Sequence, residues 1–207
     1  MDNISGVAQD NTPVQAVTAT KLNLACGKLL RPKEEGWLNA DIQQLEGVDI
    51  AFNCFVVPWP FEDNQFEHIY AGHIVEHIPH VIREVQNGRP EPIWDMDGFF
   101  VWFREVYRIL KPGGTIELVG PYHRSSGADQ DPTHTRYITE ATFSYLWQES
   151  PTFDYRLGYK FEQTEWGLSF SHPDMATLQA VNPTEWQKAA MFYWNAFSNF
   201  RTVLKKV

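Results

Sequence analysis

Two histidines and an aspartate lie close together in the segment Tyr122–Arg136, which reads YHRSSGADQDPTHTR. Histidine titrates near neutral pH, so His123 and His134 are suited to take a proton from a hydroxyl or an amine. Asp131 could orient a histidine or bind a substrate hydroxyl. We therefore predict that His123, Asp131 and His134 are catalytic. They could instead bind a divalent metal, but the spacing H-x7-D-x2-H matches no standard metal motif, so no metal is expected.

A second candidate site lies between Lys21 and Asp41, in KLNLACGKLLRPKEEGWLNAD. The pattern predicts a short buried strand at Leu22–Cys26 and another at Trp37–Ile42, with Asp41 at its C-terminal end. Small residues in the intervening turn let the backbone approach a ligand, and the carboxylate can accept hydrogen bonds from both ribose hydroxyls. These residues alone are compatible with two interpretations, a nucleoside site and an ordinary strand–loop–strand unit.

The composition favours one globular domain. The chain has 207 residues, of which 43% are hydrophobic, enough for a sizeable core. We expect residues 1–18, which are small and polar, to form a flexible arm and residues 19–207 to form a single domain. A net charge of −9 disfavours binding of free nucleic acid, and no apolar run predicts a membrane span. Two cysteines, Cys26 and Cys54, are too few for a disulfide framework, so we expect a reduced, cytoplasmic setting.

Short apolar segments bounded by turn residues predict the strands of the first 120 residues. They are Leu22–Cys26, Trp37–Ile42, Val48–Phe52, His68–Gly72 and Thr115–Gly120. Apolar residues at helical spacing predict a helix over Met96–Leu110, stopped by Pro112 and the two glycines after it. The long connection Pro79–Asp95 could line a site.

The remaining residues predict fewer and less regular elements. We expect a helix after Thr139, an irregular strand in Tyr155–Phe170, and a helix capped by Asn182 whose apolar stripe extends to Phe197. Arg201–Val207 is predicted to be a last edge strand. Strands that alternate with helices predict an α/β fold with a mostly parallel sheet, which binds ligands at the C-terminal edge of its strands.

Five segments occur in order: LNLACG at 22–27, PWPFEDNQFEHIY at 58–70, AGHIVEHI at 71–78, LKPGG at 110–114 and DPTH at 131–134. This set resembles the class I (Rossmann-like) S-adenosylmethionine-dependent methyltransferases, in particular small ones with LNLGCG, PWPF, EH, LKPGG and DPTH signatures. The resemblance covers roughly Leu22–Leu146. It implies a Rossmann-like, mostly parallel sheet with flanking helices, reduced helices in the N-terminal half and an antiparallel edge strand near the C-terminus.

The resemblance also implies which residues bind S-adenosylmethionine. The first motif passes close to the methionine part, Asp41 takes the ribose hydroxyls, the segment after the third strand lines the adenine, and His73 lies near the methionine amino group. The implied cofactor-binding residues are Asn23, Ala25, Cys26, Gly27, Asp41, Ile42, Asn53, Cys54, Phe55 and His73. Ala25 stands where the family more often has glycine, and Asn53 where an acidic residue is more usual. Cys54 and Phe55 could equally be core residues.

We therefore expect a methyltransferase that uses S-adenosylmethionine and releases S-adenosylhomocysteine. The expected acceptor is a small polar molecule, first of all a sugar or nucleotide-sugar methylated on oxygen. The alternatives are methylation of a nucleobase or modified nucleotide, and a non-catalytic subunit that binds the cofactor. A dinucleotide-dependent oxidoreductase is disfavoured, because the turn A-C-G-K-L-L has a single glycine where a pyrophosphate needs several.

Overall fold

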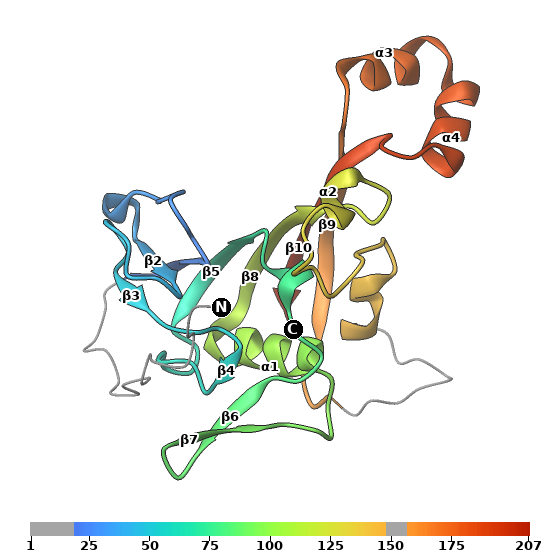
Figure 1. Ribbon diagram of the computed structural model, residues 1–207. Helices are drawn as coiled ribbons and strands as arrows, with labels where there is room; N and C mark the ends of the chain where they lie inside the picture. The colour runs from blue at the N-terminus through green and yellow to red at the C-terminus, as the bar shows by residue number, and fades with distance from the viewer. Residues whose placement is uncertain (1–18, 148–156) are drawn as a thin grey trace.

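The computed structural model describes residues 19–147 and 157–207. The predicted arm at 1–18 and the start of the predicted strand at Tyr155 lie outside the described residues. Seven strands form one sheet in the order β3-β2-β1-β5-β8-β10-β9 (Figure 1). They are β1 (Lys21–Leu24), β2 (Trp37–Asp41), β3 (Ile50–Ala51), β5 (Phe66–Gly72), β8 (Leu110–Pro121), β9 (Phe161–Phe170) and β10 (Phe197–Lys206).

The strand directions confirm the predicted α/β fold with a mostly parallel sheet. The pairs β1–β2, β2–β3, β1–β5 and β5–β8 are parallel, whereas β10 is antiparallel to both β8 and β9. In the central strands β1 and β5, Leu22, Leu24 and Ile69 lie on one face of the sheet and are buried, whereas Asn23 and Tyr70 lie on the other face. No helix in the described residues is both long enough and apolar enough to cross a membrane.

Helix α1 (Gly98–Ile109) packs its apolar face against the sheet, close to the predicted range Met96–Leu110. Trp102, Phe103 and Val106 are fully buried in the main core. The Asp97 side chain caps the helix by accepting a hydrogen bond from the backbone N–H of Phe99 at 2.8 Å. Glycine is needed at position 98, because a Cβ there would lie 2.1 Å from the backbone oxygen of Pro79.

Helices are reduced in the N-terminal half, as expected, and buried asparagines hold the long β1–β2 loop instead. A single 3-10 turn, η1 (Lys33–Glu35), is the regular structure between these two strands. The Asn23 side chain donates to the carbonyl of Leu29 and to Asn39 Oδ1, both at 2.8 Å. Asn39 in turn pairs with both backbone polar groups of Arg31. These side chains satisfy backbone groups that a helix would otherwise satisfy.

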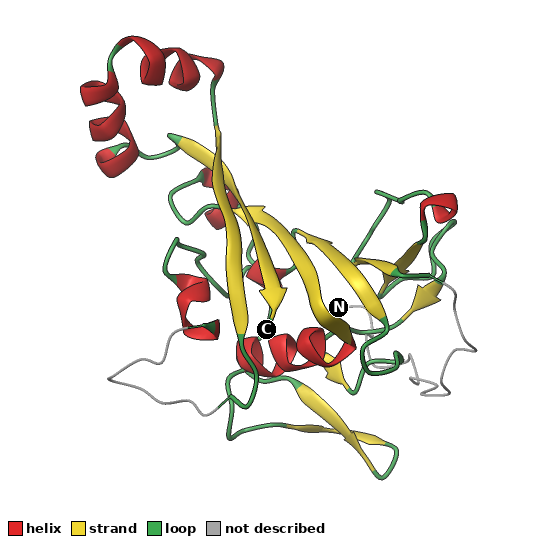
Figure 2. Ribbon diagram, turned by 180° about the vertical axis from the view of Figure 1, so that it is seen from behind, coloured by secondary structure: helices red, strands yellow, loops and turns green. Residues whose placement is uncertain are grey.

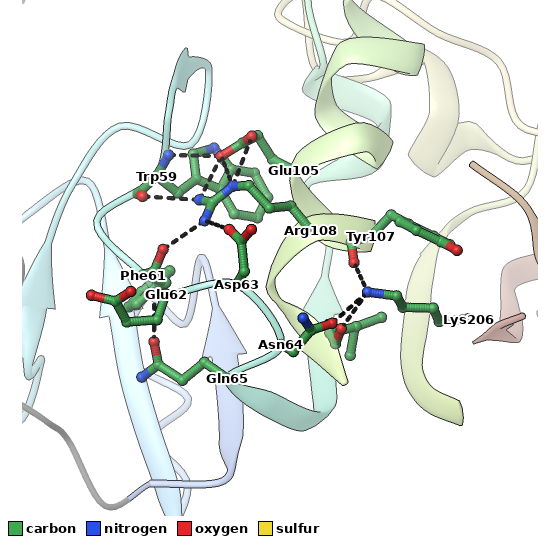
Figure 3. Close-up of polar contacts among 11 residues, drawn as sticks. Trp59, Phe61, Glu62, Asp63, Asn64, Gln65, Glu105, Tyr107, Arg108 and Lys206 are labelled. Atoms are coloured by element: carbon green, nitrogen blue, oxygen red, sulfur yellow. Dashed lines mark hydrogen bonds and ion pairs between the residues drawn. The ribbon is translucent and has the colours of Figure 1, made fainter. Parts of the chain in front are cut away.

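The PWPFEDN segment connects β4 (Val56–Val57) to β5 and is held against α1 by hydrogen bonds and ion pairs (Figure 3). The buried carboxylate of Glu105 accepts from the backbone N–H of Trp59 at 2.8 Å and pairs with the Arg108 guanidinium at the same distance. Arg108 also donates to the carbonyls of Trp59 and Phe61 and pairs with Asp63. This motif of the resemblance is therefore explained by packing and hydrogen bonding within the fold.

The C-terminal strand is not at the edge of the sheet, which corrects one prediction. Residues 201–206 belong to β10, which lies between β8 and β9, and β9 forms the edge. Phe197 is also not part of a helical stripe, because α4 (Pro183–Phe192) ends before it and Phe197 begins β10. The chain turns at Asn195 in a left-handed conformation, and Phe197 packs against Tyr122 in the second core cluster.

Several elements were not predicted. The connection Pro79–Asp95 contains a hairpin, β6 (Arg83–Gln86) and β7 (Arg89–Pro92), which pairs with the short strand β4 (Val56–Val57). Helix α3 (Pro173–Val181) precedes α4, and together they extend beyond the ends of β9 and β10 (Figure 2). The helix expected after Thr139 is a 3-10 turn, η3 (Thr142–Leu146), and a short helix α2 (Ser126–Asp129) follows β8.

Candidate functional site

The point where the strand order reverses lies between β1 and β5. From β1 the chain proceeds to β2 and β3 on one side, and β5 and β8 then lie on the other side. Crevices at such a point, beyond the carboxyl ends of parallel strands, are where open α/β sheets bind ligands. Leu24 pairs with Ala71 across β1 and β5, so the residues that follow each strand emerge side by side. Ala25, Gly27 and His73 are thereby brought to one edge.

The backbone at this edge adopts uncommon conformations. Ala25 and His73 have φ angles of 56° and 54°, in the left-handed region that non-glycine residues rarely adopt. Such conformations cost about 1–3 kcal/mol each and cluster at functional sites. The His73 N–H donates to the carbonyl of Val119 at 2.7 Å, which fixes the turn after β5 against β8. The left-handed Ala25 explains why glycine would also suit this position.

Asp41 connects the two loops that follow β1 and β2. Its Oδ2 accepts from the N–H of Gly27 at 2.8 Å, and its Oδ1 accepts from the N–H of Gln43 at 3.0 Å. Each carboxylate oxygen can accept a further hydrogen bond. A Cβ placed on Gly27 would meet no atom within 4 Å, so the space beside the turn is open. Ile42 is exposed next to Asp41. This geometry suits a ribose whose hydroxyls donate to Asp41.

The third predicted segment is partly core. Asn53 Oδ1 accepts from the N–H of Phe55 at 2.9 Å, and Phe55 packs half-buried against the main core. Cys54 is buried in that core, where desolvation raises the pKa of its thiol to about 12. Burial, followed by the charge of Asp41, raises the pKa of Cys26 to about 11. Neither thiol is therefore ionised near neutral pH.

Asn23 lies beneath the site. Its side chain is 1% exposed, and both of its amide hydrogens are used within the protein. We assign it the role of holding the loop that carries Gly27.

The three predicted catalytic residues occupy different surroundings. His123 packs its ring against Tyr122 with centroids 4.6 Å apart. Burial, followed by the charge of Arg124, lowers the pKa of His123. Asp131 is half-buried and accepts from both the N–H and the hydroxyl of Thr133, and these bonds lower its pKa. His134 is half-buried and packs its ring 4.6 Å from that of His77.

The sequence did not indicate a role for Glu76. Its side chain is 1% exposed, although a glutamate before a histidine in the EH motif carries no burial signal. Glu76 Oε1 lies 3.3 Å from His73 Nδ1. This contact raises the pKa of His73, and its effect outweighs that of partial burial, which lowers the pKa. The backbone carbonyl of Glu76 accepts from the N–H groups of Thr135 and Arg136, which joins the DPTH loop to the segment after β5.

A cavity of about 650 Å³ adjoins this loop. Its lining combines exposed aromatic rings with charged groups and comes from the start of α1, both ends of the Pro79–Asp95 connection and residues after His134. Among the lining residues are His80, Asp95, Phe100, Arg136, Tyr137 and Tyr145. The Arg136 guanidinium pairs with Asp97 at 2.7 Å and donates to the carbonyl of Ile78. Arg136 therefore braces the cavity wall.

No protein-family model matches the chain, and no curated protein matches its sequence. Solved structures do match. An S-adenosylmethionine-dependent methyltransferase from Archaeoglobus fulgidus has a TM-score of 0.53 and 15% identity, over 91% of this chain and 86% of that one. The [4+2]-cyclase SpnF has a TM-score of 0.50 and 16% identity, over 94% of this chain and 77% of that one.

A chain from the complex of the Haloferax volcanii Trm112 methyltransferase activator with a putative methyltransferase has a TM-score of 0.50 and 15% identity, over 91% of this chain and 82% of that one. The protein thus has the Rossmann-like fold of S-adenosylmethionine-dependent methyltransferases. At these identities the similarity establishes the fold and leaves the chemistry to the site residues.

Proposed function

We propose that the protein is an S-adenosylmethionine-dependent methyltransferase. The observation that carries the proposal is the contact between Gly27 and the Asp41 carboxylate at the point where the strand order reverses. This contact joins a ligand-accessible turn to a ribose acceptor at the position where such sheets bind nucleosides. When bound, the cofactor supplies an activated methyl group on a sulfonium.

The protein's own residues have distinct roles in this proposal. Asp41 accepts from the ribose hydroxyls, the left-handed turn Ala25–Gly27 passes along the methionine part, and His73 lies at its amino group. Ile42, Asn53 and Phe55 lie on the adenine side, where Phe55 offers a half-buried ring. Cys26 and Cys54 support these loops as protonated thiols.

The proposed acceptor is a small polar molecule, first of all a sugar or nucleotide-sugar methylated on a hydroxyl. The cavity supports it, because Tyr137 and Tyr145 expose aromatic rings for stacking beside Asp95 and His80, which can bind hydroxyls. In the loop Tyr122–Arg136, Asp131 holds the backbone in place, and a neutral histidine takes the proton from the acceptor hydroxyl. His123 fits that role because its pKa is lowered.

Calorimetry with S-adenosylmethionine and S-adenosylhomocysteine tests the cofactor. No binding by folded protein at millimolar concentration would contradict the proposal. Mass spectrometry of sugars, nucleotide-sugars and nucleotides incubated with the protein then shows which class gains a methyl group. A methylated nucleotide with unmodified sugars would favour the nucleobase alternative.

The similarity to SpnF favours a second candidate function, because that protein is a cyclase with a related fold. The fold therefore also occurs in a protein whose named activity is a cyclisation rather than a methyl transfer. Binding of S-adenosylmethionine with no product S-adenosylhomocysteine, across all acceptor classes, would support an alternative in which the protein binds the cofactor without transferring its methyl group.

Replacement of Asp41 by alanine should weaken cofactor binding at least about tenfold, because charge-assisted hydrogen bonds to ribose contribute roughly 1.5–3 kcal/mol each. The variant also loses the bond to Gly27, so Asp41→Asn, which keeps an acceptor oxygen, should be less affected. Calorimetry measures both. Glu46→Ala is the control, since Glu46 is an exposed carboxylate five residues away. Unchanged affinity in Asp41→Ala would exclude Asp41 from the site.

A further inference from the structure

Three possible metal ligands from distant parts of the sequence meet beside the DPTH loop. Glu76, His77 and His134 each offer one ligand atom, and these atoms all lie within 4.8 Å of one another. Glu76 and His77 belong to the 3-10 turn η2 (Val75–His77) after β5, whereas His134 follows α2. We propose that these three side chains bind a divalent transition-metal ion of the zinc type.

The surroundings of the Glu76 carboxylate favour a bound cation. The side chain is 1% exposed, and neither of its oxygens has a hydrogen-bond partner. His73 Nδ1 lies 3.3 Å from Oε1, but this contact lacks hydrogen-bond geometry. The glycine at position 120 leaves room for this carboxylate, because a Cβ on Gly120 would lie only 3.0 Å from Glu76 Oε2. A buried carboxylate without a hydrogen-bond partner is costly, and metal coordination is one of the ways in which proteins offset that cost.

The ring of His134 is held in the tautomer that a metal needs. Its Nδ1 lies 2.9 Å from the backbone oxygen of Ala128. A carbonyl oxygen only accepts, so Nδ1 must carry the hydrogen and donate it. The lone pair of the neutral ring is then on Nε2. Metal-bound histidines usually donate their other N–H to a carbonyl or carboxylate in this way.

The ring of His77 is held in the same tautomer by a relay. Its Nδ1 lies 3.1 Å from the Thr133 hydroxyl, and that hydroxyl donates its single hydrogen to Asp131 at 2.7 Å. Thr133 must therefore accept from His77 Nδ1, which leaves the His77 Nε2 lone pair available. Asp131 thus acquires a role in orienting His77 through Thr133. The sequence motif DPTH supplies the relay and one ligand together.

The donor set suits zinc better than a hard cation. Two imidazoles and one carboxylate are the protein ligands of many zinc sites that keep an open fourth position, whereas Mg²⁺ and Ca²⁺ prefer oxygen ligands. Tetrahedral bonds of about 2.0–2.1 Å place ligand atoms about 3.3 Å apart. The ligand atoms here lie within 4.8 Å, so closure by at most about 1.5 Å, through side-chain rotation, completes the site.

This ligand set differs from His123, Asp131 and His134, which the sequence analysis considered as metal ligands and disfavoured because of their spacing. His123 takes no part, and Asp131 acts only through Thr133. An ion on His134 occupies the lone pair that a general base needs, which assigns proton removal to His123. A zinc ion held by three protein ligands would keep a fourth position for a water molecule or a hydroxyl.

The test measures zinc binding to the full chain after chelator treatment, without cofactor or acceptor, so its outcome is independent of methyl transfer. We expect about one Zn²⁺ per chain by calorimetry and by metal analysis after dialysis, a rise in the thermal midpoint, and no such response to Mg²⁺. Glu76→Gln, His77→Ala and His134→Ala should each lose this binding. Thr133→Val, which breaks the relay, should weaken it by about 10–100-fold.

His80→Ala is the matched control, because His80 is an exposed histidine that pairs with a carboxylate, Asp97, outside the cluster. It should bind zinc like the wild type. Glu76→Gln also gives a readout without metal: removal of the buried charge should raise the thermal midpoint of the metal-free protein. Absence of stoichiometric zinc in the folded wild type would overturn the proposal. So would zinc binding that is equal in Glu76→Gln, His134→Ala and the wild type.

Discussion

Turnover by the His123→Ala variant should fall by about 10²–10⁴-fold, the usual contribution of a general base. Affinity for S-adenosylmethionine should not change, because the residue acts on the acceptor and the transition state rather than on the bound cofactor. His134→Ala should lose turnover to a similar extent, because it removes a ligand of the metal ion that we propose beside the DPTH loop. Steady-state kinetics with the acceptor identified by mass spectrometry measure both variants.

The control for these variants is His172→Ala, because His172 is an exposed histidine that caps α3. It should retain full turnover. The pH profile gives an independent check, since a base must be neutral to act. The lowered pKa of His123 should place the acid limb of the profile below the ordinary histidine value of 6.5. Full activity in the His123→Ala, His134→Ala double variant would exclude this loop from catalysis.

Replacement of Arg108 by alanine should destabilise the fold by about 3–5 kcal/mol, the cost of leaving a buried charge without its partner. Glu105 is 5% exposed and would keep only the N–H of Trp59 as a partner. The carbonyl of Phe61 would lose its guanidinium donor as well. For a chain of this size the thermal midpoint should fall by about 6–20 °C. Urea unfolding measures the free energy directly.

Arg104→Ala is the control, because Arg104 lies on the same helix but takes no part in the network of Figure 3. It should change stability by less than about 0.5 kcal/mol. The Glu105→Gln, Arg108→Met double variant should recover part of the loss, because it removes both charges together. Equal stability of Arg108→Ala and Arg104→Ala would show that this ion pair does not fasten the PWPFEDN segment.

Local patterns determined the elements that depend on near neighbours in the sequence. The apolar spacing from Phe99 to Leu110 predicted α1, because a helix buries one face at that period. The central strands followed from short apolar runs between turn residues, and their alternation with a helix predicted the parallel sheet. The same reasoning placed Asp41 and Gly27 at one edge, where the structure joins them by a hydrogen bond.

Pairing between distant segments was decided only by the tertiary structure. Nothing local to Arg201–Val207 indicates that its strand inserts between β8 and β9, because an antiparallel partner is chosen by packing across the sheet. Phe197 fits the apolar spacing of a helix in the sequence, yet it begins β10, where it packs against Tyr122 in the second core cluster. In the same way, burial gives Glu76 its importance. Sequence alone shows a charged residue beside a histidine, and only the fold removes that charge from water and brings His134 to it.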